Sequence, residues 1–260
     1  MAGEKRTFRV WRGNSDGGDF VTYTPEVSEG MVVLDVLHQI QAHDAGDLAL
    51  RWNCKAGKCG SCSMEINGKP KLSCMTRMNS FEPGETITVQ PLKTFPVIKD
   101  LVTDVSWNYA QNKRIKPFTP KPKDKDGKRR MYQEDVDRVQ EFRKCIECYL
   151  CQDVCHVLRD RDRKDKFVGP RFMIRLAGLE MNPLDDADRI PEIKNEYGSG
   201  YCNITRCCTE VCPEHIAITD NGIIPLKERV AGRYYDPLAW FWRKVTGGDK
   251  KASHASHAHH

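Results

Sequence analysis

The feature that most constrains this chain is a run of four closely spaced cysteines in the segment RKCIECYLCQDVC: Cys145, Cys148, Cys151 and Cys155. The spacing C-x2-C-x2-C-x3-C brings three thiolates into two short turns, which is typical of cubane iron–sulfur sites. The fourth cysteine of such a run ligates the other cluster in two-cluster proteins, because a helix carries it away from the first three. The run therefore predicts two neighbouring cubane-type clusters.

A second run, Tyr201–Pro213, repeats this register with one position changed. Three of its cysteines align with cysteines of the first run: Cys202 with Cys145, Cys208 with Cys151, and Cys212 with Cys155. Thr205 stands where the first run has Cys148. A cube corner without a thiolate loses its iron readily, so we expect a [3Fe–4S] cluster. The expected [4Fe–4S] ligands are Cys145, Cys148, Cys151 and Cys212. The expected [3Fe–4S] ligands are Cys155, Cys202 and Cys208.

Cys207 is left over from this alignment, and two interpretations stay open. It is either a free buried thiol, as many unligated cysteines are, or a replacement for the missing fourth ligand.

A third group of cysteines follows a different pattern: Cys54, Cys59 and Cys62 in NCKAGKCGSC, with Cys74 beyond them. The spacing C-x4-C-x2-C is the plant-type pattern for a [2Fe–2S] cluster. Gly57 and Gly60 allow the backbone to curl around such a cluster. Asn67-Gly68, between the expected strands 63–66 and 70–73, is a strong hairpin signal, and this hairpin returns Cys74 to the loop as fourth ligand.

The elements around these motifs predict an α+β chain. Residues 7–11 and 20–24 alternate like two strands joined by a turn at 14–19, residues 31–42 have helical periodicity, and residues 86–90 complete a sheet. This order predicts a β-grasp domain over residues 1–108. Apolar stripes at 132–144 and a proline-initiated helix at 170–179 predict a mostly helical domain over 132–245. Residues 182–200 read as a polar connection with little pattern.

Two segments of biased composition lie outside these domains. Residues 109–131 form a linker rich in Lys, Arg and Pro, which we interpret as a solvated crossing instead of a nucleic-acid site. Residues 246–260 form a histidine-containing tail that we expect to be disordered. Trp240, Phe241 and Trp242 stand beside basic residues, which suits a membrane interface or packing on the second domain.

Composition excludes other classes of protein. The 260 residues include 12 cysteines and carry a net charge of +5. The charged start MAGEKRTFRV has no signal-peptide pattern, and a chain of this length and charge needs no disulfide staples. No apolar run reaches the length of a membrane span. Paired CxxC knuckles would favour zinc, whereas these ligands come four at a time.

The three motifs in this order resemble the iron–sulfur subunit of succinate dehydrogenase and fumarate reductase. The resemblance covers about residues 5–230 and includes KFVGP at 166–170 and VCPEHI at 211–216. It implies electron transfer from a flavoprotein subunit, which holds the FAD, through [2Fe–2S], [4Fe–4S] and [3Fe–4S] to a quinone at membrane-anchor subunits, in the tricarboxylic acid cycle and respiratory chain. It also implies a position peripheral to the inner or cytoplasmic membrane, on its cytoplasmic or matrix side, with no succinate chemistry in this chain.

Two departures from the family concern the quinone. Family members with a quinone pocket have Pro-Ser and a tryptophan pair after the cysteine matching Cys155, where this chain has His156-Val157-Leu158-Arg159. Asn203 stands where the family usually has histidine. Quinone ligands are therefore not carried over. His156 either takes part in the electron exit or serves as a helix cap or backbone partner.

Three alternatives to a succinate dehydrogenase subunit stay open: a fumarate reductase subunit, a heterodisulfide-reductase-like carrier and a glycolate-oxidase-like carrier. The last two usually carry two complete cubane runs and lack the N-terminal [2Fe–2S] domain. The direction of the reaction depends on cluster and quinone potentials.

Overall fold

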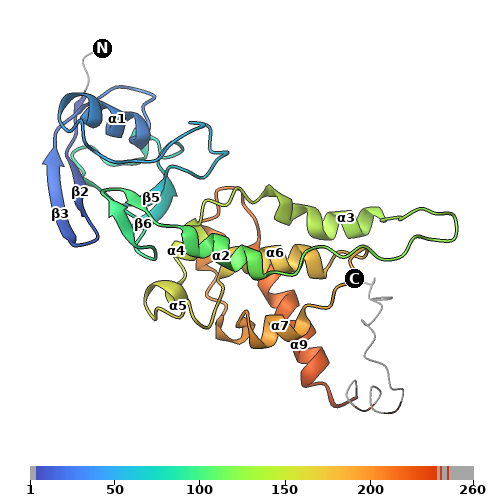
Figure 1. Ribbon diagram of the computed structural model, residues 1–260. Coiled ribbons are helices and arrows are strands. Elements are labelled where there is room, and N and C mark those ends of the chain that lie inside the picture. Colours follow the sequence, from blue (N-terminus) through green and yellow to red (C-terminus); the bar gives the residue numbers. More distant parts are fainter. Residues whose placement is uncertain (1–3, 239–240, 242–244, 246–260) are drawn as a thin grey trace.

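The structure, a computed structural model, describes residues 4–238, 241 and 245. Figure 1 shows a sheet with one covering helix at the N-terminal end and a group of helices at the other end. The predicted α+β class is confirmed. Within the described residues, no helix combines the length and the apolar character needed to cross a bilayer.

The main sheet has the order β6-β5-β7-β2-β8-β9, and β3 pairs with β2. Its strands are β2 Phe8–Asn14, β3 Gly17–Tyr23, β5 Ser63–Ile66, β6 Lys69–Leu72, β7 Ile87–Gln90, β8 Val97–Lys99 and β9 Val102–Thr103; β1 Glu4–Lys5 and β4 Glu26–Val27 pair separately. Strand β2 runs parallel to β7 and antiparallel to β3. Helix α1, Val33–His43, buries Leu34, Leu37 and Ile40, as its periodicity predicts.

The first hairpin is longer and tighter than expected. We predicted a turn over residues 14–19, but the pairing continues to Asn14 opposite Gly17. The two strands can approach closely because glycines lie in both. A Cβ on Gly13 would lie 2.3 Å from the Gly17 carbonyl oxygen, and a Cβ on Gly18 would lie 2.3 Å from the Arg12 carbonyl oxygen. The second hairpin forms as predicted, with Asn67 at φ 49° and Gly68 at φ 72° between β5 and β6.

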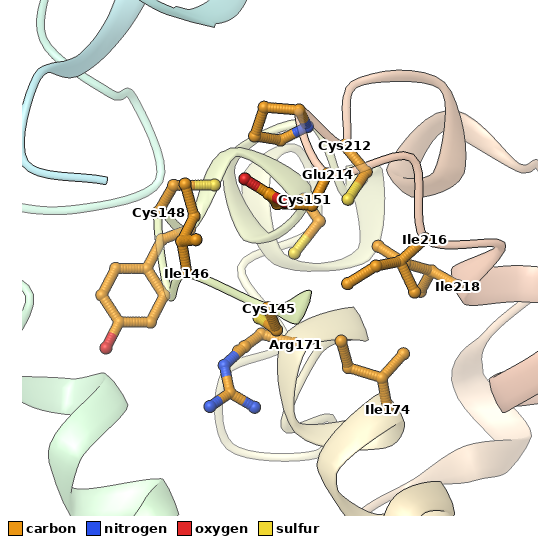
Figure 2. A pocket seen from close by; sticks show the side chains of 12 residues that line it. Cys145, Ile146, Cys148, Cys151, Arg171, Ile174, Cys212, Glu214, Ile216 and Ile218 are labelled. Atoms are coloured by element: carbon orange, nitrogen blue, oxygen red, sulfur yellow. The ribbon is translucent and has the colours of Figure 1, made fainter. Parts of the chain in front are cut away.

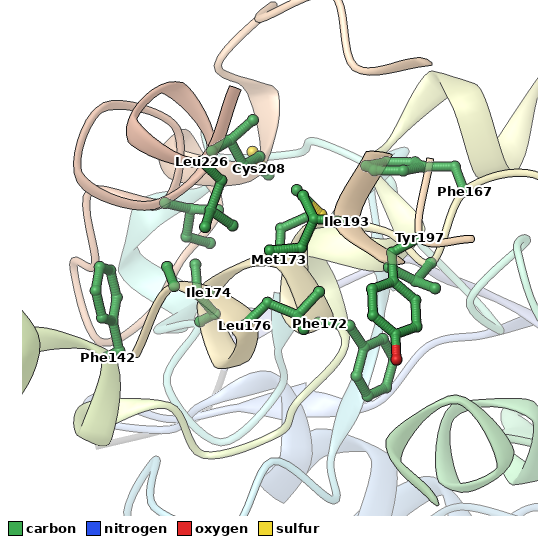
Figure 3. Packing of buried hydrophobic residues seen from close by; sticks show 14 of the residues in the cluster. Phe142, Phe167, Phe172, Met173, Ile174, Leu176, Ile193, Tyr197, Cys208 and Leu226 are labelled. Carbon is green, nitrogen blue, oxygen red and sulfur yellow. The ribbon is translucent and has the colours of Figure 1, made fainter. Parts of the chain in front are cut away.

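The second half of the chain is made of short helices. They are α2 Ser106–Arg114, α3 Gln133–Gln140, η2 Glu141–Lys144, α4 Leu150–Asp153, α5 His156–Arg159, α6 Pro170–Glu180, α7 Ile190–Asn195, η3 Ser199–Tyr201, α8 Cys207–Glu210, the π-helical η4 Ile218–Ile223 and α9 Ile224–Tyr234. Figure 3 shows how Met173, Ile174 and Leu176 of α6 gather with side chains from the surrounding helices in one core. The predicted helices at 132–144 and 170–179 are therefore present, the first as α3 followed by η2.

The interpretation of residues 182–200 as a polar connection with little pattern was wrong. Helix α7 lies inside this segment, and Ile190, Ile193 and Tyr197 are buried in the core. A helix of six residues makes fewer than two turns, so its apolar spacing repeats too few times to stand out in the sequence.

The start of the predicted linker is attached to this helical region. Buried Arg189 donates hydrogen bonds to the carbonyl oxygens of Lys116 (3.0 Å) and Pro117 (2.6 Å). Its guanidinium also pairs with buried Asp185 at 2.9 Å. The rest of the linker, residues 121–130, is mostly exposed. Trp240 and Trp242 lie outside the described residues, and Phe241 is exposed.

Candidate iron–sulfur sites

The first cysteine loop lies between α1 and β5 and adopts no regular structure. The backbone amides of Ala56 and Lys58 both donate to the Cys54 sulfur at 3.3 Å. Gly57 and Gly60 have φ values of 67° and 69°, so both glycines serve the predicted curl of the chain. Amides that point at sulfur are what a cluster loop requires, because such hydrogen bonds stabilise the charge on the sulfur atoms.

The four cysteines of this site lie within electrostatic reach of one another. Burial raises the pKa of Cys74 to about 12, and contact with Cys62 and the charge of Cys54 add to the effect. Burial also opposes ionisation of Cys59, but hydrogen bonds from Ser61 and Cys54 outweigh it and lower the pKa of Cys59 to about 6. The hairpin β5–β6 thus returns Cys74 to the loop. This donor set suits a [2Fe–2S] cluster.

The second site is a cavity lined by four cysteines: Cys145, Cys148, Cys151 and Cys212. Figure 2 shows the labelled cysteines around this cavity, with Ile174, Ile216 and Ile218 on one side. Its volume is about 340 Å³ including the open mouth. Among the described residues, no three His, Cys, Asp or Glu side chains converge closely enough to hold a single metal ion; the four thiols surround a volume instead. The donor set and the apolar walls fit a [4Fe–4S] cluster.

Burial changes the chemistry of these thiols before any iron binds. It raises the pKa of Cys148 to about 12 and that of Cys151 well above its usual value, with the other cysteines of the set adding to the effect. The free thiols are therefore protonated at neutral pH. Cluster assembly must release these protons, since iron binds thiolates.

The two cysteine runs share one backbone conformation. Glu147 and Tyr149 have φ values of 56° and 62°, and the aligned residues Ile204 and Arg206 have 61° and 64°. A four-residue helix follows in each case, α4 after Tyr149 and α8 after Arg206. The alignment of the runs is therefore a structural repeat.

The third group of thiols lies around the start of α5 and α8. Burial raises the pKa of Cys155 to about 12, and the neighbouring thiols of Cys207 and Cys208 contribute. Burial likewise raises the pKa of Cys208 to about 11, with Cys207 and Cys202 adding to it. Lys227 donates to the carbonyl oxygen of Cys202 at 2.6 Å and so holds that loop. The fold thus gathers the three expected ligands.

Cys207 lies in the same neighbourhood. It is the first residue of α8, is half-buried, and its sulfur is 3.3 Å from the Thr205 hydroxyl oxygen. In the structural repeat it corresponds to Leu150, the first residue of α4. Both interpretations of Cys207 stay open on this geometry.

His156 is the first residue of α5, whose N-cap is Cys155. Its Nε2 atom is buried and has no hydrogen-bond partner among the described residues. The interpretation of His156 as a helix cap is therefore not supported, and a role in electron exit stays a prediction.

Sequence reasoning missed a buried cation beside the second site. Arg171, in the first turn of α6, lines the four-cysteine cavity and pairs with Glu147. Burial opposes its charge, but the neighbouring Cys145 and Glu147 outweigh burial and raise the pKa of Arg171. The only sequence signal for this residue is that it directly follows the phrase KFVGP.

The first and second sites are in contact through the backbone. A Cβ on Gly60 would lie 2.7 Å from the Cα atom of Cys148, so the [2Fe–2S] loop touches the first cubane run. Nearby, Lys58 of the loop pairs with Glu214 at 3.0 Å. Gly60 directly follows Cys59, so a proposed ligand of each candidate cluster lies at this contact.

A buried charge cluster also joins the two halves of the chain. Arg159 pairs with Glu65 of β5 at 2.8 Å and lies 3.9 Å from Asp153, and both carboxylates are fully buried. The Thr94 amide donates to Asp153 at 3.0 Å. Burial raises the pKa of Asp153 to about 7, and the charge of Glu65 adds to the shift.

Comparison with known families defines the class of protein. Residues 7–109 match the family described as "2Fe-2S iron-sulfur cluster binding domain", and residues 141–216 match "4Fe-4S dicluster domain". Together with the three groups of thiols, these matches define a two-domain iron–sulfur electron-transfer protein.

Similar proteins then identify the particular family. The chain is 34% identical over 203 residues to the fumarate reductase iron–sulfur subunit of Mycobacterium tuberculosis, covering 76% of this chain and 80% of that protein. It is 32% identical over 219 residues to the fumarate reductase iron–sulfur subunit of Wolinella succinogenes, covering 82% of this chain and 87% of that protein. A chain of the Mycobacterium smegmatis Sdh1 complex is 60% identical, with a TM-score of 0.88 over 91% of this chain and 99% of that one. This chain belongs to the family of iron–sulfur subunits of succinate dehydrogenases and fumarate reductases, as the resemblance predicted.

Proposed function

We propose that this chain is the electron-transfer subunit of a succinate dehydrogenase. When bound, the three clusters would each accept and release one electron, in the order [2Fe–2S], [4Fe–4S], [3Fe–4S]. The observation that carries this proposal is the contact between Gly60 and Cys148, because it joins the loop of the first site to a ligand of the second. Close sites favour direct transfer between clusters without a carrier.

The proposed ligands follow the three groups of thiols. The [2Fe–2S] set is Cys54, Cys59, Cys62 and Cys74; the [4Fe–4S] set is Cys145, Cys148, Cys151 and Cys212; the [3Fe–4S] set is Cys155, Cys202 and Cys208. The four-cysteine cavity supports the second set, and the neighbouring thiols of Cys155, Cys202 and Cys208 support the third. The division into domains 1–108 and 132–245, linker 109–131 and tail 246–260 is part of the same proposal.

The proposed partners are those of the family. A flavoprotein subunit with FAD would deliver electrons, and membrane-anchor subunits would receive them for a quinone near the third cluster or within the anchor. The similarity to a chain of the Sdh1 complex supports assembly with such partners. The chain would then be peripheral to the membrane on its cytoplasmic or matrix side, with no nucleic acid as partner.

Fumarate reductase is the second candidate, because relatives of 34% and 32% identity carry that name. The two functions differ in direction, so we would measure succinate oxidation with a quinone acceptor and fumarate reduction with a quinol donor on the same purified complex. Faster succinate oxidation supports the first proposal, and faster fumarate reduction supports the second.

The test of the cofactors is elemental analysis with EPR of the purified complex. We expect about nine irons per chain, the sum for one cluster of each type. The oxidised sample should show a three-iron signal, and reduction should bring up the signals of the other two clusters. Stoichiometric zinc with little iron would overturn the proposal.

A further inference from the structure

Arg171 is a buried cation on the wall of the four-cysteine cavity. Its side chain is 6% exposed, whereas that of Glu147, with which it pairs, is 47% exposed. Figure 2 shows Arg171 beside Cys145, on the side of the cavity opposite Cys148, Cys151 and Cys212. A buried charge on the wall of a metal site acts at short range and with little screening by water.

The position of Arg171 is determined by contacts that do not involve its charge. Gln152, fully buried, accepts a hydrogen bond from the Arg171 backbone amide at 3.2 Å. The amide group of Gln152 donates to Val168 O at 3.0 Å and to Asn108 Oδ1 at 3.3 Å. These bonds hold the first turn of α6 against the cavity, so the guanidinium does not depend on Glu147 alone for its place.

The ion pair does not cancel the field of Arg171 within the cavity. Glu147 is half in contact with water, which screens its charge, while Arg171 is shielded from water. The Arg171 Nε atom, moreover, has no hydrogen-bond partner among the described residues. Glu214 also lines the cavity; its side chain is 16% exposed and pairs at 3.0 Å with Lys58, which is 70% exposed. Arg171 brings a buried positive charge to its own side of the cavity, close to Cys145.

We propose that Arg171 raises the reduction potential of the [4Fe–4S] cluster held by Cys145, Cys148, Cys151 and Cys212. This inference rests on the proposed function, since it takes these cysteines as ligands. Reduction adds one electron, supplied by the reduced [2Fe–2S] cluster, and makes the four-iron cluster one unit more negative; no bond or proton has to move. A nearby fixed cation stabilises the more negative form more strongly, and local charge is one of the determinants of cluster potential. Arg171 is thus a tuning residue that makes the four-iron cluster a better electron acceptor.

The test is a redox titration of the purified complex, followed by the EPR signal of the reduced four-iron cluster. In Arg171→Gln, we expect the ratio of reduced to oxidised cluster to fall about tenfold at the potential where the wild type is half-reduced, which is about 59 mV for a one-electron couple. Arg171→Lys keeps the charge and should restore most of the potential.

Glu147→Gln is the matched control, because it removes the other partner of the same ion pair. Removing this half-exposed carboxylate should raise the potential by a smaller amount, opposite in direction to the effect of Arg171→Gln. A merely structural role of the ion pair would instead give both variants the same direction of change. Potentials unchanged in both variants, or shifted in the same direction, would overturn the inference. If Arg171→Gln does not assemble the cluster, the shift in Glu147→Gln decides: an upward shift supports the inference, and any other result overturns it.

The same experiment separates failure of this inference from failure of the proposed function. If the proposed function is wrong, the wild-type complex itself lacks the EPR signal of a four-iron cluster. If only the inference is wrong, that signal is present and the substitutions leave its potential unchanged.

Discussion

At the scale of single residues, our proposal of a three-iron cluster depends on Thr205, which stands where the first run has Cys148. The two cysteine runs share their left-handed residues and the short helix that follows. The backbone therefore presents the side chain of Thr205 as it presents that of Cys148. The absence of a thiolate there is a matter of residue type, because the local geometry is already the one that the first run uses for a ligand.

We predict that Thr205→Cys converts the [3Fe–4S] cluster into [4Fe–4S]. The new thiolate supplies the missing ligand, so the iron content should rise from about nine to about ten per chain, with a lower potential at this centre. The oxidised three-iron EPR signal should disappear.

Cys207 provides the matched comparison, since its sulfur lies 3.3 Å from the Thr205 hydroxyl oxygen. With three ligands as proposed, Cys207→Ser should keep the three-iron signal. A wild type that lacks this signal, together with its appearance in Cys207→Ser, would make Cys207 the fourth ligand and refute our ligand set.

At the scale of elements, helix α6 connects the core to the four-cysteine cavity. Its far side packs Met173 and Leu176 into the core, and its first turn carries Arg171. Gly169 is the N-cap of the helix, with φ 87° and ψ 168°, a conformation available essentially only to glycine. A Cβ there would also lie 2.1 Å from the Gln152 side-chain oxygen. The start of α6 is therefore set by glycine and glutamine together.

We predict that Gly169→Ala destabilises the protein by at least about 2 kcal/mol, since it combines backbone strain with overlap at a buried side chain. The measurement is the thermal midpoint of the purified complex. Gly232→Ala in α9 is the control, because a Cβ there meets nothing within 4 Å and alanine favours the helix. Equal effects of the two substitutions would show that the start of α6 has no special constraint.

At the scale of the whole molecule, the two halves have separate cores and a third apolar cluster between them. Leu34, Leu72 and Phe95 from the first half pack with Tyr149 and Leu150 of the second. The ring centroids of Phe95 and Tyr149 are 6.1 Å apart, edge to face. The charge cluster of Glu65, Asp153 and Arg159 lies across the same junction. Both kinds of contact hold the first cluster loop against the first cubane run.

We predict that Arg159→Gln destabilises the protein by about 2–4 kcal/mol, because it removes the cation that lies between buried Glu65 and Asp153 and leaves only the half-exposed Lys93, 3.8 Å from Glu65. The thermal midpoint of the purified complex measures the effect. Arg130→Gln is the control, since it removes pairs with Asp124 and Asp126 that are exposed to water and therefore contribute little to stability. A similar shift for both substitutions would contradict the importance of the buried cluster.

We further predict that Cys59→Ala removes the [2Fe–2S] EPR signal and leaves both other clusters in place. Cys59 lies outside the apolar cluster that joins the two halves, so its loss should not disturb the second core. Succinate-to-quinone activity should fall to near zero, because electrons from the flavin lose their first acceptor. Loss of all three signals with the protein retained would argue against independent assembly of the two regions.

Much of this architecture was predictable from local pattern. Cysteine spacing is a covalent property of the chain, so it predicted the [2Fe–2S] and [4Fe–4S] domains that the family matches support. Asn67-Gly68 specified its hairpin through its own backbone preferences. The helix at 33–43 showed its buried face in its periodicity. Repetition of the cysteine register even predicted that Cys212 would join the first run, and the cavity contains it. Helix α7 was missed because its six residues make fewer than two turns, so the apolar spacing hardly repeats.

The tertiary structure alone decided which distant residues meet. Arg171 reaches the cavity because Gln152 and Gly169 set the start of α6, and no local pattern encodes that contact. Arg159 joins Glu65 and Asp153 only because the β5–β6 hairpin packs against α4 through β6. Spacing along the chain determines which thiols can share a cluster, since a few bonds limit their separation. The charges around that cluster depend on packing between segments that are far apart in sequence. These segments meet only in the folded chain, where the burial of apolar surface and the fit of side chains determine their positions.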